Sequence, residues 1–202
     1  MQPSQLFSKD EIKDLVISIL VISLIFSFKT SPFGIDFKML PYFIIIVIVA
    51  FFFHELAHRT VARRFGCIAF YKMWPSGIFF GLFLMMIGIK FVAPGAVVIY
   101  PYEFGRWGYR TKRLTAPESG LIALSGPATN LIFAIIFSFF GGWFFQNLTF
   151  INAFLAFFNL LPFPPLDGSK IMEWRIWIWG LLIAIAGLMV AFKFIMPGAT
   201  LF

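Results

Sequence analysis

Both histidines of the chain lie four residues apart in one apolar segment, Phe51-Phe-Phe-His-Glu-Leu-Ala-His58. Residues four apart lie on the same face of a helix, so His54 and His58 can reach a common metal ion. Glu55 between them can then act as a general base on a metal-bound water. The surrounding apolar run, Leu40 to Arg64, is long enough to cross a lipid bilayer. The rest of the chain has to fit a metal-binding helix inside a membrane.

The composition also indicates a membrane protein. Of the 202 residues, 60% are hydrophobic and only 12% are charged, whereas soluble domains carry roughly 25% charged residues. The net charge of +7 is explained most simply by basic residues in cytoplasmic loops, which orient multi-pass proteins. We expect no nucleic-acid partner, because no basic run is interleaved with aromatic residues. Cys67 is the single cysteine, which excludes an intrachain disulfide and a cysteine-based zinc site.

Long apolar stretches follow one another along the chain, separated by short loops that contain glycine, proline and charged residues. Stretches of this length match the thickness of a bilayer at 1.5 Å per residue of helix. They predict an all-α polytopic membrane protein with about five to six transmembrane helices. The expected spans lie near residues 12–28, 40–64, 121–140, 150–159 and 176–196.

The orientation of the second span follows from the charges at its end. Arg59, Arg63 and Arg64 close this span, which places that end in the cytoplasm by the positive-inside bias. Glu55 then lies roughly 12 Å inward of Arg63 along the helix axis. We therefore expect the metal site to lie within the membrane but nearer its cytoplasmic face.

The segment from residue 68 to residue 100 follows no single pattern. Residues 68–74 alternate weakly, as a strand does, whereas residues 77–88 are apolar and rich in glycine. A single span here would place the basic loop that follows outside the cell, against the charge bias. We expect a re-entrant or strand-containing segment near residues 68–100 that returns on the same side. Irregular backbone at that depth is tolerated where it lines a water-filled cavity, so this segment should roof the site.

A second ionisable residue is expected at membrane depth, in Asn159-Leu-Leu-Pro-Phe-Pro-Pro-Leu-Asp-Gly168. Three prolines within four residues cannot continue a helix, so the span that begins near Phe150 should unwind there. A catalytic zinc needs three protein ligands and an open position. Asp167 is the best available third ligand, with a helix N-cap as its alternative role. For the histidine pair, the alternative is two interfacial side chains without a metal.

Three motifs together resemble those of the site-2 protease family of intramembrane zinc metalloproteases. They are His54-Glu-Leu-Ala-His58, Gly126-Pro-Ala-Thr-Asn130 and the proline-rich motif at 159–168. Their order and expected placement in the membrane match the family along residues 40–175. The first motif alone recurs by chance, but joined to the third in a polytopic chain it is highly specific.

The resemblance implies that His54, His58 and Asp167 bind one zinc ion per chain and that Glu55 is the catalytic base. It implies that Asn159 holds the substrate backbone or the oxyanion. The substrates would be transmembrane segments of other proteins in the lipid bilayer, cut in regulated intramembrane proteolysis. Many relatives carry a PDZ or CBS domain. We expect neither here, and a single membrane domain over residues 1–202 with its core at 40–175.

Two further positions are expected to support the site. Asn130 lies four residues after Gly126, on the same helix face, and an amide inside a membrane usually finds a partner across a helix interface. Gly126 and Pro127 should allow a bend and a close helix approach. Val97 lies in a segment that can offer a strand edge to an unwound substrate. The alternative for Asn130 and for Val97 is ordinary packing.

Two other functions use the same residues. A catalytically inactive scaffold or substrate-binding relative would retain the metal site, but it has no need of Glu55. A metal transporter needs ligands across the whole bilayer, and the sequence places no further carboxylate or histidine inside the apolar spans. We therefore expect a zinc-dependent intramembrane endopeptidase. The compact chain favours a prokaryotic cell membrane.

Overall fold

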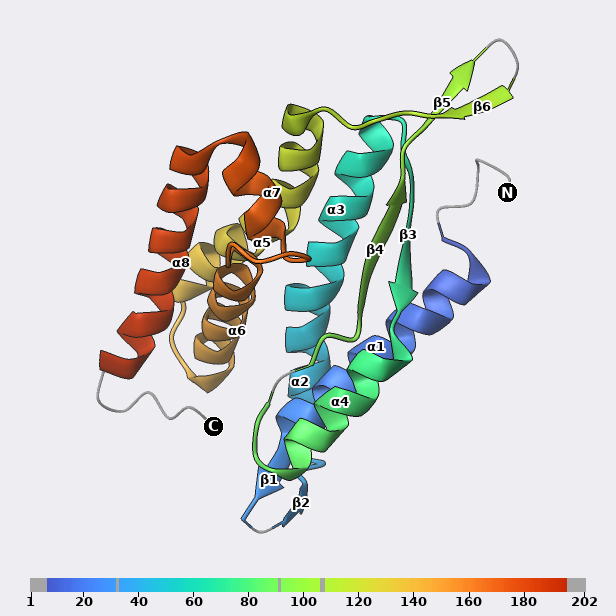
Figure 1. The fold of residues 1–202 in the computed structure, drawn as a ribbon. Coiled ribbons are helices and arrows are strands. Elements are labelled where there is room, and N and C mark those ends of the chain that lie inside the picture. The colour runs from blue at the N-terminus through green and yellow to red at the C-terminus, as the bar shows by residue number, and fades with distance from the viewer. Residues whose placement is uncertain (1–6, 32, 91, 106–107, 196–202) are drawn as a thin grey trace.

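The computed structural model describes residues 7–31, 33–90, 92–105 and 108–195 (Figure 1). Within these residues the chain is mostly helical. The helices are α1 (Lys9–Ser27), α2 (Leu40–Val47), the π-helical turn η1 (Ile48–Phe52), α3 (Phe53–Arg64), α4 (Pro75–Met86), α5 (Ala116–Ser138), α6 (Trp143–Asn159), α7 (Asp167–Trp174) and α8 (Ile176–Ile195). The strands are β1 (Phe28–Thr30), β2 (Phe33–Ile35), β3 (Ile68–Met73), β4 (Gly95–Tyr100), β5 (Tyr102–Gly105) and β6 (Gly108–Thr111).

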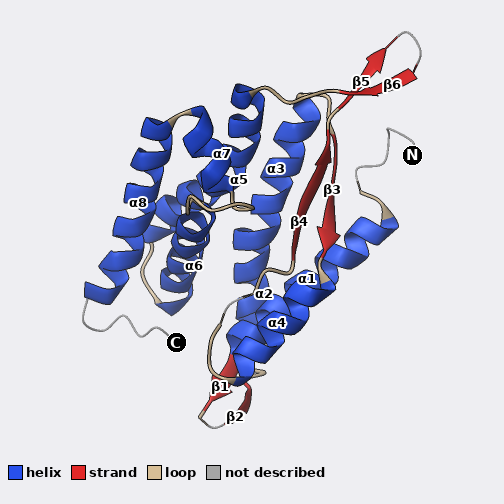
Figure 2. Ribbon diagram, in the orientation of Figure 1, coloured by secondary structure: helices blue, strands red, loops and turns tan. Residues whose placement is uncertain are grey.

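Helices α5 to α8 and the β3–β4 strand pair lie on opposite sides of α3, and α1 and α4 lie on the strand side. Figure 2 shows α5 to α8 gathered on one side and β3 and β4 on the other, with α3 between them, whereas β1 and β2 lie at the lower end of the molecule. The strands form three separate antiparallel pairs, β1–β2, β3–β4 and β5–β6. The fold is therefore mostly helical rather than all-α. Two of the strands, β3 and β4, fall in residues 68–100, where strand content was predicted.

The helix that carries the histidines is continuous over Leu40–Arg64. Pro41 lies in its first turn, where the missing N–H costs no hydrogen bond. The helix is followed by Gly66 with φ +77°, a left-handed position that glycine adopts easily. The π-helical turn at Ile48–Phe52 directly precedes the histidine motif. Such turns break the regular hydrogen-bond ladder and recur at functional sites.

Helix α5 is the centre of the helical side, where it packs against α3, α6 and α7. Its first turn is fixed by a capping box, in which Thr115 and Glu118 satisfy each other's backbone N–H groups. Pro127 lies inside this helix. The core around it includes buried Leu131, Leu160 and Ile171, from α5, the end of α6 and α7.

Two helices of the described residues are long and apolar enough to cross a membrane, Leu40–Arg64 and Ala116–Ser138. Part of α8 and all of α4 are shorter apolar helices. The second and third expected spans thus coincide with these two helices, whereas the count of five to six spans stays a prediction.

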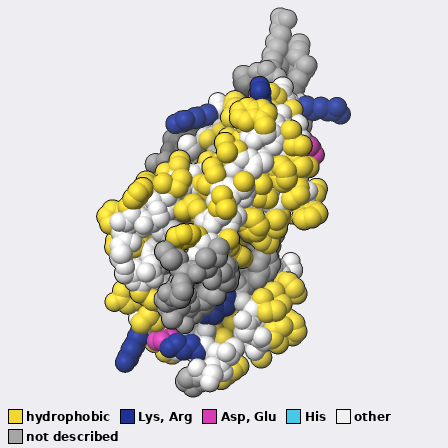
Figure 3. All heavy atoms as spheres, turned by 90° about the vertical axis from the view of Figure 1, so that its left-hand side faces the viewer, with side chains coloured by type: hydrophobic (Ala, Val, Ile, Leu, Met, Phe, Trp, Pro, Cys, Tyr) yellow, Lys and Arg dark blue, Asp and Glu magenta, His cyan; other side chains and the backbone are white. Residues whose placement is uncertain are grey.

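The surface over α8 is largely apolar. Figure 3 shows hydrophobic side chains over the middle of this face, with Lys and Arg side chains near its upper and lower ends. Ile176, Leu181 and Leu188 of α8 are all more than half exposed. An apolar band between charged ends is the pattern of a helix that faces lipid.

The segment from β3 to β4 starts at the C-terminal end of α3 and returns to the same end, where Tyr100 lies opposite Ile68. The two strands pair antiparallel, with Ile68 opposite Tyr100 and Met73 opposite Gly95. Helix α4 lies between them in sequence and packs against α1. In Figure 1 the strand pair runs beside α3, on the side away from α8. This places β4 against the histidine helix.

The proline-rich segment interrupts the helical chain as expected. Helix α6 ends at Asn159 and α7 begins at Asp167. The seven residues between them form turns and bends. Cys67, the single cysteine, is buried. The break brings the first residue of α7 back toward α3.

Candidate metal centre

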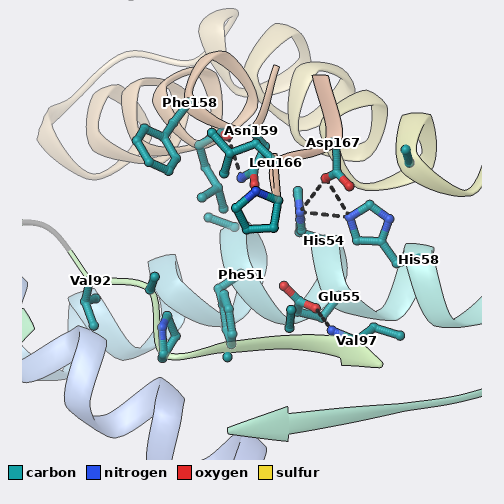
Figure 4. Close-up of a pocket in the computed structure, with 18 of the residues that line it drawn as sticks. Phe51, His54, Glu55, His58, Val92, Val97, Phe158, Asn159, Leu166 and Asp167 are labelled. Carbon is teal, nitrogen blue, oxygen red and sulfur yellow. Dashed lines mark hydrogen bonds and ion pairs between the residues drawn. The ribbon is translucent and has the colours of Figure 1, made fainter. Parts of the chain in front are cut away.

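The candidate ligand atoms of His54, His58 and Asp167 converge, all within 4.8 Å of one another. Nε2 of His58 lies 3.0 Å from Nε2 of His54 and 3.0 Å from Oδ2 of Asp167. The same carboxylate oxygen lies 3.7 Å from Nε2 of His54. Neighbouring ligand atoms of a tetrahedral zinc lie about 3.3 Å apart, so the three side chains fit one ion of that size (Figure 4).

The outer nitrogens of both imidazoles are held by oxygen acceptors. Nδ1 of His54 donates to Oδ1 of Asn130 at 2.5 Å, and Nδ1 of His58 donates to the carbonyl oxygen of Ile122 at 2.8 Å. With the protons on Nδ1, both Nε2 lone pairs face each other and the carboxylate of Asp167. This arrangement is repulsive until a cation lies between them. The donor set therefore fits a metal ion.

Gly126 leaves the space that such an ion needs. A Cβ atom at this position of α5 would lie 2.3 Å from Nε2 of His58 and 2.7 Å from Nε2 of His54. No side chain of any other residue type fits there without displacing the imidazoles. The predicted close helix approach at Gly126 is confirmed, and the neighbouring helix is the one that carries the histidines.

Asn130 links His54 to two further elements. Its Nδ2 donates to the carbonyl oxygen of Ala50 at 2.8 Å and to Oδ1 of Asn152 at 2.9 Å. Asn152 in turn donates to the carbonyl oxygen of Leu148 at 2.8 Å. Ala50 lies in the π-helical turn, so the irregular part of the helix and the amide that holds His54 meet at one point. Asn130 therefore forms a hydrogen bond with a candidate ligand, which is more than the ordinary packing given as its alternative role.

Asn152 was not singled out by the sequence analysis. It is fully buried on α6, 22 residues from Asn130 in the chain. A buried asparagine in an apolar helix was the available signal, because such an amide needs a partner. Its partner could not be identified without knowing which faces of α5 and α6 meet.

Glu55 lies beside the candidate ligands on the face of α3 that meets strand β4 (Figure 4). Its side chain is buried, and Oε2 accepts a hydrogen bond from the backbone N–H of Val97 at 3.0 Å. Val97 therefore contacts the site through its main chain. The predicted strand at Val97 is present, and its amide at this point is already bonded to the candidate base.

A cavity of about 660 Å³ opens in front of these residues. Helix α3 and strand β4 form one wall, and the end of α6 with the turn before α7 forms the other (Figure 4). The polar groups His54, Glu55, His58, Asn159 and Asp167 line it together with mainly apolar side chains. The proline break thus contributes to the site by supplying the wall opposite α3.

The break places Asn159 and Asp167 differently. Nδ2 of Asn159 donates to the carbonyl oxygen of Leu155 at 2.9 Å, and the residue lines the cavity. Asp167 is the first residue of α7, whose N-cap is Leu166 without a side-chain hydrogen bond. The alternative role of Asp167 as a helix N-cap is therefore wrong. Gly168 allows this turn, because a Cβ there would lie 2.1 Å from the carbonyl oxygen of Leu160.

The sequence of this chain is similar to those of zinc metalloproteases, as a metal centre of this kind suggests. The sequence profile of Peptidase family M50 matches residues 142–187, which include the proline break and Asp167. The chain is 39% identical over 194 residues to the protein named "Putative zinc metalloprotease MJ0611" of Methanocaldococcus jannaschii, covering 87% of this chain and 90% of that protein. The chain belongs to peptidase family M50.

A second relative extends the match to bacteria. The M50 chain is 33% identical over 163 residues to "Putative zinc metalloprotease YwhC" of Bacillus subtilis, covering 67% of this chain and 69% of that protein. No solved structure matches the chain. The resemblance to the site-2 protease family is confirmed, and the protein is a zinc metalloprotease of the M50 family.

Proposed function

We propose that this M50 metalloprotease hydrolyses peptide bonds within transmembrane segments of other membrane proteins. The observation that carries the proposal is the placement of the converging ligands. His54 and His58 lie on a 25-residue apolar helix, Leu40–Arg64, and Asp167 meets them from the start of α7. All three line a largely apolar cavity. A site in this setting is accessible to a substrate that is itself apolar.

We assign one zinc ion per chain to His54, His58 and Asp167. The spacing of their ligand atoms and the gap at Gly126 support this assignment. When bound, zinc polarises the scissile carbonyl group and makes the attacking water more acidic. Asn130 and the carbonyl oxygen of Ile122 keep Nε2 of each imidazole unprotonated and directed at the ion.

Glu55 is the proposed general base. Its carboxylate lies on the cavity beside His54, where it takes the proton from the attacking water and returns it to the leaving amine. The backbone N–H of Val97 holds the carboxylate in this place. Asn159, on the opposite wall, supplies an amide donor to the oxygen on which negative charge develops.

The free edge of β4 is the proposed binding surface for the substrate backbone. A helical substrate hides its amide bonds and has to unwind locally, and an extended segment can then pair with a strand edge. Gly95, Val97 and Ile99 alternate along the edge that faces the cavity. Because the N–H of Val97 is bonded to Glu55, the pairing relies on the backbone groups at Gly95 and Ile99.

We place the protein in a prokaryotic cell membrane as a multi-pass protein, with the site nearer the cytoplasmic face. The family is membrane-associated, and the two relatives named above come from an archaeon and a bacterium. Arg59, Arg63 and Arg64 at the end of α3 support the orientation. The proposed partners are a transmembrane protein substrate and the lipid bilayer.

The test is cleavage of a tethered transmembrane substrate by the purified protein with its zinc content measured. The wild type should bind about one zinc per chain and cleave. Glu55→Gln should retain the zinc and cleave about 10²- to 10⁴-fold more slowly, because it lacks the base. Glu173→Gln, at an exposed position of α7, is the matched control and should behave as wild type.

Two outcomes would decide against the proposal. Cleavage that survives Glu55→Gln would mean that the base, and with it the protease mechanism, is wrongly assigned. Zinc binding by a wild-type protein that cuts no transmembrane substrate would favour the catalytically inactive scaffold instead.

A further inference from the structure

Strand β3 has an outer edge that is covered by side chains from other elements. In an antiparallel pair, backbone groups of alternate residues point away from the partner strand. On β3 the outward N–H groups of Tyr71 and Met73 donate to the carboxylates of Glu11 and Asp14, each at 3.1 Å. The outward carbonyl oxygen of Ala69 accepts from Nε of Arg63 at 3.2 Å. This edge is therefore closed to another strand.

Glu11 is held in place by a buried ion pair. Its Oε1 lies 2.8 Å from Nε of Arg59, and Oε2 accepts from Nη2 of the same guanidinium at 3.3 Å. The two side chains are 2% and 4% exposed. The guanidinium also lies over the ring of Phe7, 4.0 Å from its centroid. Arg59 follows His58 directly, so this pair ties α1 to the histidine helix.

A buried ion pair of this kind is weak evidence for stability, since apolar residues of similar volume often stabilise a protein as well or better. It does couple the positions of α1 and α3, because a shift of either partner leaves the other buried charge without its ion pair. Glu11 uses the same oxygen, Oε1, for Arg59 and for the N–H of Tyr71. The position of β3 is thereby set relative to α3.

Each outer edge of the β3–β4 pair is bonded to a carboxylate, and the two bonds are formed by residues that lie opposite each other. Tyr71 on β3 lies opposite Val97 on β4. The outward N–H of Tyr71 is bonded to Glu11, and the outward N–H of Val97 is bonded to Glu55. The two-stranded sheet is thus held between a carboxylate of α1 and the proposed catalytic base. Ser18 of α1 adds a hydrogen bond to the Tyr71 hydroxyl group at 2.9 Å.

We propose that Glu11 and Asp14 of α1 are positioning residues that fix where β4 lies against the catalytic helix. They do so by closing the outer edge of β3, so that only the edge of β4 is presented to the substrate backbone. The register of a bound substrate relative to Glu55 then depends on α1, which contributes no group to the chemistry. This inference rests on the proposed function, but its structural part can be tested without a substrate.

The test uses two double variants of the full-length, zinc-loaded protein. Glu11→Leu/Arg59→Met removes the acceptor for the Tyr71 N–H, whereas Glu11→Gln/Arg59→Met keeps an amide acceptor. Both lack the ion pair and neither leaves an unpaired buried charge, so they differ in the hydrogen bond to β3. Hydrogen–deuterium exchange of peptides covering residues 95–100 reports on β4 directly.

We expect faster exchange at residues 95–100 in Glu11→Leu/Arg59→Met than in Glu11→Gln/Arg59→Met, with equal zinc content. For a transmembrane substrate, kcat/KM should fall about tenfold in the first variant alone, about 1.4 kcal/mol. The products of that variant should also include cuts at neighbouring bonds, detected by their masses. If Glu11 contributed to stability alone, the cleavage site would stay the same, and the two variants would show equal exchange at residues 95–100 and equal kcat/KM.

Equal exchange at residues 95–100 and equal cleavage in the two double variants would overturn the proposal. If the wild type cuts no substrate, the proposed function fails, and the exchange comparison still decides on the positioning role. If Glu11→Leu/Arg59→Met does not fold, Asp14→Leu against Asp14→Asn applies the same comparison at the N–H of Met73. Asp36→Asn, which breaks the ion pair with Lys29 near the β1–β2 pair, is the control and should leave β4 unchanged.

Discussion

Two parts of the cavity lining are built in different ways: the candidate metal ligands with the groups that orient them, which we call the metal wall, and strand β4, which we call the strand wall. On the metal wall, both histidine side chains have a second contact that orients them, His54 with Asn130 and His58 with the carbonyl oxygen of Ile122. On the strand wall, β4 faces the cavity with backbone groups, and the N–H of Val97 holds Glu55. The metal wall depends on residue type, whereas the strand wall depends on where the main chain lies.

This difference separates two kinds of defect. A change on the metal wall alters the ligands or their orientation, so it should reduce zinc content and cleavage together. A change on the strand wall leaves the ligands in place, so it should reduce substrate binding at constant zinc content. A variant that mixed the two effects would show that the walls are coupled.

The largest effect is expected for Gly126→Ala on the metal wall. The added methyl group would lie 2.3 Å from Nε2 of His58, in the space between the imidazoles where the ion is expected. Zinc content should fall from about one per chain to near zero, and cleavage should be lost. Metal analysis of the purified protein and the transmembrane-substrate assay measure both.

The matched control is Gly180→Ala, a glycine-to-alanine change within α8 where a Cβ would meet nothing within 4 Å. It should bind zinc and cleave as wild type does. Full zinc occupancy in Gly126→Ala would place the ion elsewhere and would contradict the assignment of His54 and His58.

The next largest effect is expected for Asn130→Ala. Without the Oδ1 acceptor, the proton of His54 is no longer fixed on Nδ1, and the ring can rotate. Loss of a group that orients a metal ligand typically costs 10- to 100-fold in metal affinity or activity. A zinc titration with a competing chelator measures the affinity. An unchanged affinity would mean that the Ile122 carbonyl and the helix alone orient the ligands.

A smaller effect, of another kind, is expected for Ile99→Pro on the strand wall. Proline removes a backbone N–H from the edge of β4 that faces the cavity, whereas Ile99→Ala keeps it. KM for a transmembrane substrate should rise about tenfold in the proline variant alone, the loss of one backbone hydrogen bond, with zinc content unchanged. Val97→Pro is a less selective test, because it also removes the partner of Glu55.

If Ile99→Pro and Ile99→Ala bind substrate equally well, the substrate does not pair with this part of β4. If zinc content falls in the proline variant, the strand wall supports the ligands, and the separation between the walls is wrong.

The same contrast explains what the sequence could predict. The candidate ligands follow from local rules, since a spacing of four places His54 and His58 on one face and three prolines before Asp167 force a turn. The strands at residues 68–100 and the helix break were likewise predictable from local patterns. The number of transmembrane spans stays a prediction, since two helices of the described residues, Leu40–Arg64 and Ala116–Ser138, are long and apolar enough to cross a membrane.

The contacts that bring the walls together were not predictable. The bonds from Glu11 to Tyr71 and from Glu55 to Val97 join a side chain to a backbone N–H, and every residue except proline offers that group. No residue type marks the strand partner, and the sequence separations are 60 and 42 residues. Predicting these bonds requires the strand register, which depends on how α1, α3 and the strand pair pack.

The smallest effect is expected for Asn152→Ala, which tests how far the metal wall extends behind His54. Asn152 is linked to His54 through Asn130: its Oδ1 accepts from Asn130 at 2.9 Å and so keeps the Asn130 amide from turning over. Asn130 retains its bond to Ala50 in this variant, so zinc affinity should fall only a few-fold, less than in Asn130→Ala.

Asn147→Ala is the matched control, because Asn147 is equally buried on the same helix and donates to its own helix at the carbonyl oxygen of Trp143. A loss of zinc affinity in Asn147→Ala as large as in Asn152→Ala would assign the effect to packing of α6. A loss confined to Asn152→Ala would mean that the metal wall includes a residue two hydrogen bonds away from the nearest ligand.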